Sequence, residues 1–506
     1  MWRIWRFTIS PYLHPRRVKE LPYWIPYAAS YALSILETLA LTCNSRIRNG
    51  SQEPFAVSVL GTKLYFLTNP ADVSESFRNV TTLSWEKYLD VLLVSFGVKK
   101  NAMPLLHKDN QSLDRLFSTV TNTNNRARKR KLLDFADLAY RRQLAVDKVD
   151  ELSSVFFRTL HETASWPQLA YKTTYGSHSR LTVRDLLDRT LARGIAKMFF
   201  GEVIFDLEPE MARHTLGFAD GLWCLIYRYP RFLAKDFYNS YERILNAIEH
   251  FTALDPAETS QASFLIRNMI EAQKLAGLDA RSAAALTSVL YEAAFANVHA
   301  TAFWLLSYIL FDNNLRSALC AEILPAFKDG QFDTTYIVQN CPLLESCFRE
   351  VCRLHIVSYS VRLIEAQTKF GDKVLEPGNM LLVPFGQLHH DENVWGSDHA
   401  KFSPTRFLHS KGNSLASNQS YRPFGGGANL CPGKAFANRQ VLSFTAYILY
   451  SYEVSVPLVD GKAQRMPLIQ DNIPTFGTSV PQPGMDPLID LTPRIIEPIQ
   501  SIKSWS

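Results

Sequence analysis

The 506-residue sequence contains few cysteines and shows no periodic pattern of glycine or proline, which excludes several classes of protein. It has seven cysteines and no CxxC pair, so a disulfide scaffold is disfavoured and a reducing compartment is expected. Its 22 glycines and 26 prolines show no periodic spacing, which excludes a collagen-like chain. The sequence also lacks internal repeats and linker-like stretches, so we expect one large domain.

The sequence also has only a small excess of one sign of charge. The sequence has 54 basic and 48 acidic residues, which gives a net charge of +6 and a pI near 8.8. It contains no zinc-finger pattern, no RNP motif and no basic region with heptads. The mild positive balance permits an anionic partner or a membrane surface, but it does not indicate nucleic acid.

Apolar residues are plentiful, at 47% against 20% charged residues, which is enough for a large core and argues against disorder. The pattern is mostly helical between about residues 130 and 330. Residues 55–68 predict a hairpin that turns at Gly61-Thr62, and residues 371–384 predict a second that turns at Pro377-Gly378. The fold class predicted is therefore mainly α with small β-sheets.

The amino-terminal 45 residues are aromatic, basic and apolar, but they match neither a signal peptide nor a clean membrane span. The opening MWRIWRF leads directly into prolines and basic residues instead of an apolar run. The apolar stretch 21–43 is interrupted by Pro26 and Glu37. We interpret residues 1–45 as a membrane-interface segment, and an ordinary frayed terminus is the alternative.

A second apolar stretch lies in the middle of the chain. Residues 293–310 contain no formal charge and are long enough to cross a bilayer. However, Asn297, His299 and Thr301 lie inside the stretch, and Glu292 directly precedes it. Such groups are costly in lipid, so the stretch predicts a long helix through a globular core.

The segment with the clearest chemistry is residues 421–433, YRPFGGGANLCPG. Glycines let a backbone approach a flat ligand, and a cysteine near a helix amino terminus is stabilised as a thiolate, which is a good axial ligand for haem iron. A phosphate-binding loop is excluded, because Ala428 and Ala435 occupy its glycine and hydroxyl positions. Cys431 has no nearby ligands for zinc. A structural turn with a buried cysteine remains open from this segment alone.

The run from Phe424 to Gly433 resembles the haem-binding signature of cytochromes P450, FxxGxxxCxG, with Gly427 at the central glycine. The resemblance implies that Cys431 ligates the iron of haem b and that Phe424 packs beneath the haem. It also implies a P450-like fold over residues 46–506, with a long central helix over the haem. Electrons would come from NADPH through NADPH–cytochrome P450 reductase.

Two further motifs extend the resemblance. Glu350 and Arg353 match the family's ExxR, and residues 402–407, FSPTRF, are similar to its FxPxRF. The resemblance implies that Arg406 completes a buried Glu–Arg–Arg cluster. Many members carry an arginine for a haem propionate where this chain has Asn429. Arg362 is then the candidate by position, and a surface arginine on a strand is the alternative.

The central helix departs from the family pattern (A/G)GxDT, whose acid and alcohol deliver protons to iron-bound dioxygen. Here Asn297 replaces the glycine, His299 the acid and Ala300 the alcohol, while Thr301 is one residue late and about 100° round the helix. Asn297 is expected to hold a water or substrate oxygen. His299 is a candidate proton source, and a hydrogen-bonded core histidine is the alternative.

The segment ANVHATAFW resembles the branch of sterol 7α- and 12α-hydroxylases and prostacyclin synthase. That branch leaves two reactions open. The favoured one is monooxygenation of a small apolar substrate, either a sterol, another lipid or a secondary metabolite, because this is the commoner P450 activity. The alternative is an electron-independent isomerase or dehydratase that acts on a peroxide. Thr475, Phe476 and Gly477 are expected to contribute to the pocket, and the cytosolic face of the endoplasmic reticulum is the expected location.

Overall fold

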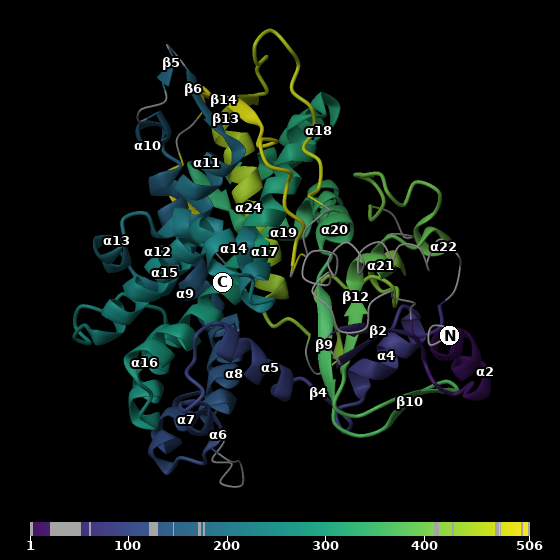
Figure 1. The fold of residues 1–506 in the computed structure, drawn as a ribbon. Coiled ribbons are helices and arrows are strands. Elements are labelled where there is room, and N and C mark those ends of the chain that lie inside the picture. Colours follow the sequence, from purple (N-terminus) through teal and green to yellow (C-terminus); the bar gives the residue numbers. More distant parts are fainter. Residues whose placement is uncertain are drawn as a thin grey trace. The chain divides into compact units, whose positions relative to one another are not determined.

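The computed structural model describes residues 4–20, 52–59, 62–120, 130–144, 146–170, 174–175, 178–408, 414–427, 430–470, 475, 477–496 and 499–503 (Figure 1). The chain forms two compact units, each of which is described by itself. The first combines Met1–Val91, Arg349–Cys431 and Ile469–Val480, and the second combines Leu92–Phe348, Pro432–Leu468 and Pro481–Ser506. The apolar stretch 21–43 lies outside the described residues.

The first unit contains a six-stranded sheet in the order β1-β2-β3-β12-β9-β4. Its strands are β1 Lys19–Glu20, β2 Phe55–Val59, β3 Thr62–Phe66, β12 Met380–Pro384, β9 Tyr359–Ile364 and β4 Leu83–Ser84. Strands β2 and β3 pair antiparallel, and the rings of Phe55 and Phe66 stack across the pair. The predicted first hairpin is therefore confirmed, but Thr62 belongs to β3 and pairs with Val59 instead of lying in the turn.

The predicted second hairpin is wrong. Strand β11 (Lys373–Leu375) pairs backward with β10 (Thr368–Phe370), through a tight turn at Gly371, where φ is +57°. Strand β12 instead lies beside β9 and β3 in the six-stranded sheet (Figure 1). The reason is burial, because β12 is an almost continuous apolar run that fits the middle of a sheet and not the edge of an isolated hairpin.

Helix α4 (Pro70–Arg78) covers part of the core of the first unit. Its amino terminus is capped by Asn69, whose side chain accepts hydrogen bonds from the backbone amides of Ala71 and Asp72. Pro70 occupies the first helical position. Val73 and Phe77 on its inner face pack among buried residues of β3, β12 and helix α21 (Phe385–His389). The unit's other helical segments are η1 Trp5–Ile9, α2 Ser10–Leu13, α21 Phe385–His389 and α22 Glu392–Trp395.

The second unit is mainly helical. The division between the two units falls inside two helices, α5 Glu86–Ser95 and α20 Pro342–His355, so each helix contributes residues to both units. Its α-helices are α6 Met103–His107, α7 Asp114–Val120, α8 Leu132–Gln143, α9 Val146–Thr163, α10 Trp166–Ala170, α11 Val183–Leu187, α12 Arg193–Phe200, α13 Val203–Leu207, α14 Met211–Ile226, α15 Lys235–Ala253, α16 Phe264–Ala276, α17 Ala280–Leu310, α18 Asn313–Ile323, α19 Thr334–Asn340 and α24 Lys434–Ser451. Short 3-10 or π turns are η2 Gln111–Leu113, η3 Asp188–Ala192, η4 Arg231–Leu233 and η5 Leu324–Ala326.

Two small sheets complete the second unit. One has the order β13-β14-β6-β5 and the other β15-β8-β7. Their strands are β13 Tyr452–Ser455, β14 Leu488–Pro493, β6 His178–Thr182, β5 Thr174–Tyr175, β15 Ser501–Lys503, β8 Gln331–Asp333 and β7 Phe327–Lys328. The prediction of a mainly α fold with small sheets is thus confirmed.

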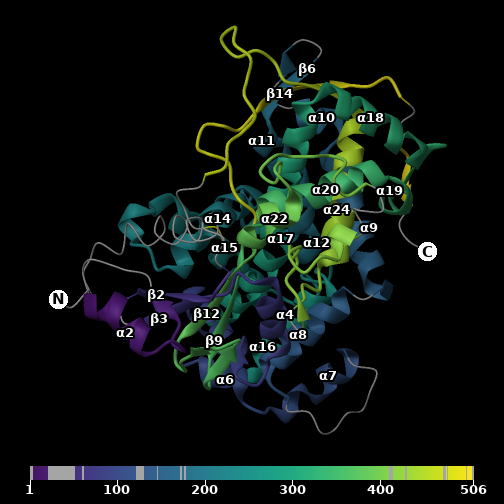
Figure 2. The same cartoon turned by 90° about the vertical axis from the view of Figure 1, so that its right-hand side faces the viewer.

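Helix α17 is the long central helix of the second unit, and it packs against α14, α15 and α24 (Figure 2). It is 31 residues long and begins after Asp279, whose side chain accepts a hydrogen bond from the amide of Ser282. Its length and composition match those of a membrane span, but 72% of its most apolar window is buried inside the protein. This burial agrees with the predicted core helix.

Candidate active site

The segment that contains Cys431 folds back on itself within the first unit. The amide of Cys431 donates a hydrogen bond of 3.0 Å to the carbonyl of Phe424, and the amide of Gly425 donates one of 3.0 Å to Arg422. These bonds turn the chain, and Cys431 is exposed. Helix α24 begins three residues further along, at Lys434, and Gly433 is its cap residue. The loop therefore presents an accessible thiol.

Glycines attach this loop closely to the end of α4. Gly427 has φ of +61°, and a Cβ atom at this position would lie 2.5 Å from the carbonyl oxygen of Phe77. A Cβ at Gly426 would lie 3.1 Å from the ring of Phe77. Arg422, at the start of the loop, donates from its guanidinium to the hydroxyl of Ser74 on α4 at 2.9 Å. The glycines are therefore required for this approach, since any side chain would push the loop away.

A buried charged cluster lies in the same unit and brings together the three residues predicted for it. Arg353 makes a two-pronged pair with Glu350 at 2.8 Å for each bond, and both side chains are 0% exposed. Arg406 donates to the same carboxylate at 2.9 Å and to Asp398 at 2.9 Å. The hydrogen bond from Arg406 lowers the pKa of Asp398. Two arginines thus share the buried carboxylate of Glu350, whereas the Asp398 side chain is 53% exposed. The buried charges tolerate no missing partner.

His389 connects this cluster to the cysteine loop. Its backbone carbonyl accepts a bond of 2.7 Å from Arg353, while its ring Nε2 accepts one of 2.9 Å from the amide of Arg422. Because an amide can only donate, Nε2 carries no proton, and Nδ1–H donates to the carbonyl of Ile356 at 3.0 Å. Burial, together with the electrostatic effect of the neighbouring His390 and Arg353, lowers the pKa of His389 to about 3. The ring is therefore neutral and has one defined tautomer.

Arg362 is a buried cation on β9. It is 6% exposed, so the alternative of a surface arginine is wrong. Its guanidinium donates to the hydroxyl of Ser360 at 2.9 Å and the carbonyl of Val361 at 2.8 Å, and its carbon lies 5.5 Å from the ring of Trp85. Among the described residues it contacts no carboxylate, and burial lowers its pKa to about 10. A buried cation in this state favours an anionic ligand.

In the second unit, His299 lies in the buried part of α17. The residue is 4% exposed, its ring stacks on Phe295 with centroids 4.7 Å apart, and its Nδ1 lies 3.4 Å from the Phe295 carbonyl. Its Nε2 lies 3.9 Å from Asp220 on α14, but Asp220 also pairs with Arg184. Burial, together with the positive charge of Arg184, lowers the pKa of His299 to about 3. The imidazole is therefore neutral near pH 7.

Thr301 and Asn297 lie one turn apart on α17. The Thr301 hydroxyl donates to the Asn297 carbonyl at 2.7 Å, and the Thr301 side chain is buried. Asn297 itself is exposed, as is Ala293 one turn earlier. Residues four apart share a helix face, so the middle of α17 presents a narrow exposed strip in a mostly buried helix. This strip is named here the α17 strip, Ala293 and Asn297.

The predicted residues thus fall into two groups. The cysteine loop, the charged cluster and Arg362 belong to the first unit, while the α17 residues and Gly433 belong to the second. Thr475 is half-buried, and the Gly477 carbonyl accepts a bond from Val357 at 3.0 Å. Phe476 and Asn429 lie outside the described residues.

Several contacts that shape the site escaped sequence reasoning. Ser74 and Phe77 on α4 have no motif that connects them to a loop some 350 residues later. Asp398 is one of 48 acidic residues, and no motif distinguishes it from the others. Glu292 directly precedes an apolar stretch, a position where an acidic residue is ordinary. The spacing of His389 gives no signal that its ring meets the backbone of Arg422.

Comparison with known proteins identifies the family. The family profile described as Cytochrome P450 matches residues 91–473, so the chain belongs to the cytochrome P450 family. It is 23% identical over 479 residues, 92% of each chain, to the cytochrome P450 monooxygenase poxD of Penicillium oxalicum.

Two other relatives match shorter stretches. A cytochrome P450 monooxygenase of Gibberella zeae is 29% identical over 221 residues, 40% of this chain and 41% of that one. The steroid 17-alpha-hydroxylase/17,20 lyase of Ictalurus punctatus is 36% identical over 121 residues, 23% of each chain.

Family membership establishes the class of reaction. The protein is an oxidoreductase, a haem-thiolate monooxygenase whose haem is ligated by a cysteine thiolate and whose electrons come from NADPH through a reductase. When bound, the haem supplies the dioxygen chemistry, and the thiolate favours cleavage of the O–O bond.

Proposed function

We propose that this enzyme hydroxylates or otherwise oxidises a small apolar substrate, a sterol, another lipid or a secondary metabolite, at a haem ligated by Cys431. The observation that carries the proposal is the exposed thiol on a glycine loop bound closely to α4, in the same unit as a buried arginine that contacts no described carboxylate. These residues fit a haem, because the cofactor needs both a thiolate and partners for its propionates.

The predicted residues in and around the cysteine loop then have the following roles. Cys431 ligates the iron, Arg362 pairs with a propionate, and the half-buried Phe424 packs near the sulfur. Gly427 lets the loop approach α4, and Gly433 opens helix α24. The cluster of Glu350, Arg353 and Arg406 has a structural role, because it holds the segment before the cysteine loop.

On α17 we assign contact with the reacting oxygen to Asn297, which is the predicted distal residue with an exposed side chain. Thr301 donates its hydroxyl proton to the Asn297 carbonyl and supports that residue from the buried side. His299 is neutral and donates to the Phe295 carbonyl, so it holds the helix edge against α14 and does not act as a charged proton carrier near pH 7.

An isomerase that acts on a peroxide is the second candidate. A specific observation favours it: the helix carries Ala300 where the family usually has an alcohol, and a neutral His299 where it usually has an acid. The resemblance of ANVHATAFW to sterol 7α/12α-hydroxylases and prostacyclin synthase supports the same branch. The relatives named above are monooxygenases or hydroxylases, which favours the first candidate.

The test of this proposal is spectroscopic. The reduced carbon monoxide complex of the wild-type enzyme should show the thiolate-ligated Soret band, and Cys431→Ser should abolish it. Cys320→Ser is the matched control, because Cys320 is a half-buried thiol in the second unit, and it should keep the band. Turnover with reductase and NADPH supports the monooxygenase, whereas turnover only with a hydroperoxide and without electrons supports the isomerase.

We further propose that residues 1–45 bind a membrane interface at the cytosolic face of the endoplasmic reticulum and that residues 46–506 form the haem domain. The described part of this segment carries exposed large apolar side chains, namely Ile4, Trp5, Ile9, Tyr12 and Leu13. Arg16 and Arg17 follow in the sequence and are exposed. Aromatic and aliphatic side chains beside basic ones suit the headgroup region of a bilayer.

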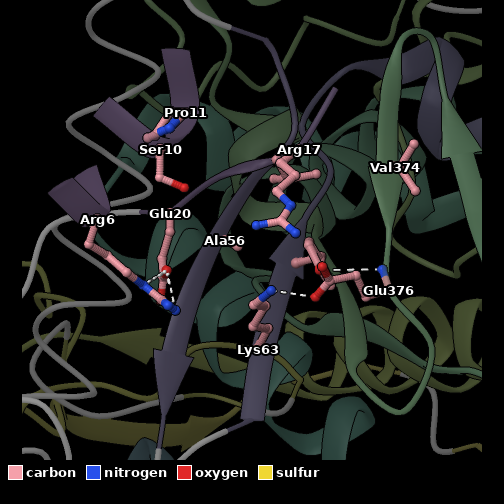
Figure 3. A pocket seen from close by; sticks show the side chains of 11 residues that line it. Arg6, Ser10, Pro11, Arg17, Glu20, Ala56, Lys63, Val374 and Glu376 are labelled. Atoms are coloured by element: carbon pink, nitrogen blue, oxygen red, sulfur yellow. Dashed lines mark hydrogen bonds and ion pairs between the residues drawn. The ribbon is translucent and has the colours of Figure 1, made fainter. Parts of the chain in front are cut away.

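Backbone hydrogen bonds hold this segment on the sheet of the first unit, beside a small pocket (Figure 3): β1 pairs with β2, and the amide of Val374 donates to the carbonyl of Arg16 at 2.9 Å. Arg6 pairs with Glu20 at 2.9 Å, and Lys63 pairs with Glu376 across the same pocket. The segment therefore has a fixed place on the unit while its apolar side chains are exposed. Flotation with anionic liposomes tests the proposal: the double variant Trp5→Glu/Tyr12→Glu should float less than the wild type, and equal flotation would contradict it.

A further inference from the structure

A small pocket lies in the first unit between the amino-terminal helical segment and the six-stranded sheet (Figure 3). Its lining includes three basic side chains, Arg6, Arg17 and Lys63, and two acidic ones, Glu20 and Glu376. All of its lining residues belong to the same unit. Its volume is about 70 Å³, whereas a single buried water needs about 10–15 Å³. The pocket therefore has room for a group of a few heavy atoms, but not for a sterol.

Each acidic side chain of the pocket has a partner in the protein. The guanidinium of Arg6 lies 2.9 Å from the carboxylate of Glu20, which also accepts a hydrogen bond from the hydroxyl of Ser58. The ammonium of Lys63 donates to the carboxylate of Glu376, and this bond lowers the pKa of Glu376. Both carboxylates are thus compensated by groups of the protein, and one basic side chain is left in excess.

Arg17 is that side chain, because no described residue forms an ion pair or a hydrogen bond with its guanidinium. Its backbone has a fixed place, since it forms a parallel bridge with Val374 of β11. Figure 3 shows its guanidinium between the two ion pairs of the pocket. Its charge also helps to lower the pKa of Glu376, which agrees with this position. Arg17 therefore brings a positive charge and five N–H donors to the pocket.

The charge and shape of the pocket define the ligand that it suits. The guanidinium of Arg17 would repel a cation, and an apolar group would leave it without an acceptor. A planar guanidinium binds the oxygens of a phosphate or a carboxylate through two parallel hydrogen bonds. One basic side chain in excess matches a group with one negative charge. The pocket thus suits a small oxyanion.

The helical segment beside the pocket favours one kind of oxyanion. Arg6 and Ser10 lie four residues apart and line the pocket. Trp5, Ile9 and Leu13 are also four apart, and all three are exposed. Residues at this spacing share a face of a helix, so the segment has a polar face at the pocket and a separate apolar face. A bilayer surface matches both faces, because its phosphate groups lie beside the ends of its acyl chains.

We propose that this pocket binds a singly charged phosphate group, with Arg17 as its main ligand and with Arg6 and Lys63 as further positive charges. Two sources share this chemistry, namely the headgroup of an anionic glycerophospholipid and a free phosphate ester, and the two arms of the test separate them. The lipid source rests on the proposed membrane interface of residues 1–45. The phosphate site itself rests only on the pocket.

Three variants of the full-length protein test the site. Arg17→Met removes the guanidinium that lacks a described partner. Arg16→Met is the matched control, because Arg16 is the adjacent exposed arginine and does not line the pocket. Glu376→Gln removes a negative charge and releases Lys63, so it should tighten binding, which a damaged fold would not do. Thermal unfolding is recorded first to confirm that each variant is folded.

The first arm uses a soluble probe, glycerophosphoglycerol, which is the headgroup of phosphatidylglycerol, and follows its binding by phosphorus NMR. Arg17→Met should weaken binding about tenfold, as the loss of a charged hydrogen-bonding partner implies. Arg16→Met should change it less than about twofold, because an exposed charge outside the pocket contributes little. Glu376→Gln should strengthen it about threefold or more, because the excess positive charge rises.

The second arm measures flotation with vesicles of phosphatidylcholine and phosphatidylglycerol in a three-to-one ratio, against vesicles of phosphatidylcholine alone. Every basic residue near an anionic surface adds attraction, so Arg16→Met should weaken binding about fivefold. Arg17→Met should weaken it about a further tenfold, because it also removes the ligand of the phosphate group. If the wild type does not bind these vesicles, the membrane proposal fails and the soluble arm still judges the site.

The excess of Arg17→Met over Arg16→Met decides between the outcomes. An excess on vesicles, with or without one in the soluble arm, assigns the site to a lipid headgroup. An excess in the soluble arm alone assigns it to a free phosphate ester. No excess in either arm, or no binding at all, would overturn the inference. Neither arm depends on the haem, so failure of the proposed oxidation leaves this test intact.

Discussion

The cysteine loop of the first unit and helix α17 of the second treat buried polar groups in opposite ways. In the first unit, Glu350, Arg353 and His389 have their hydrogen bonds assigned to named protein partners. On α17, Glu292 has none among the described residues, and Asn297 is exposed. The comparison teaches that the first region is built to hold a fixed geometry, whereas α17 combines a buried acid without a described partner and an exposed amide residue.

The largest effect is expected where the first unit loses a charge. Glu350→Gln leaves Arg353 and Arg406 buried beside a neutral amide, which should cost about 3–5 kcal/mol of unfolding free energy. We expect the variant to accumulate little haem-loaded protein, measured as haem per polypeptide and by urea unfolding. The control Asp137→Asn breaks the exposed pair with Arg141 and should cost about 0.5 kcal/mol or less. Equal losses in the two variants would refute the distinction.

The next effect separates close packing from backbone strain in the first unit. Gly427→Ala must place a Cβ against the Phe77 carbonyl as well as tolerate a positive φ, so we expect a cost of about 2–4 kcal/mol. Gly378→Ala has φ of +77° but nothing within 4 Å, so it should cost about 1–2 kcal/mol. Chemical denaturation measures both. If Gly427 were needed only for its positive φ, the two variants would lose the same unfolding free energy.

A pH effect compares neutral histidines in the two units. The pKa values of His389 and His299 are lowered to about 3 in the fold, while an unfolded histidine titrates near 6.5. The unfolded state binds more protons between these values, so each ring contributes stability that is complete above about pH 6.5 and is lost as pH falls toward 3.

The slope of that loss is the measurable quantity. Each histidine contributes up to about 1.4 kcal/mol per pH unit to the unfolding free energy within this window. Urea unfolding at several pH values between 4 and 7 should show a smaller slope for His299→Gln than for the wild type, and likewise for His389→Gln. An unchanged slope for His299→Gln would mean that Asp220 keeps the folded ring protonated.

The smallest effect is expected at Thr301. Its hydroxyl donates to the Asn297 carbonyl within the same helix, so Thr301→Ala should change stability by about 1 kcal/mol or less. We expect substrate turnover and the release of hydrogen peroxide to change less than about twofold. A large rise in peroxide release would instead give Thr301 the proton-delivery role that the family's alcohol performs.

How far sequence reasoning reached depends on how local each feature is. The hairpin of β2 and β3 and the helix after Cys431 were predictable, because each arises from neighbouring residues. The second hairpin was not, because β12 pairs with β9 and with β3, more than 300 residues away. The charged cluster was predictable in its members through family resemblance, but its second carboxylate, Asp398, and its connection through His389 were not.

The sequence by itself determined the family signature, the mainly helical fold and the position of the thiol in a glycine-rich turn. These features depend on contiguous residues and on helix periodicity. Only the tertiary structure decided that Arg362 is buried, that the rings of His299 and His389 are neutral, and that Glu292 lacks a described partner. The physical reason is that charge state and hydrogen bonding follow from burial, and burial depends on segments far apart in the chain.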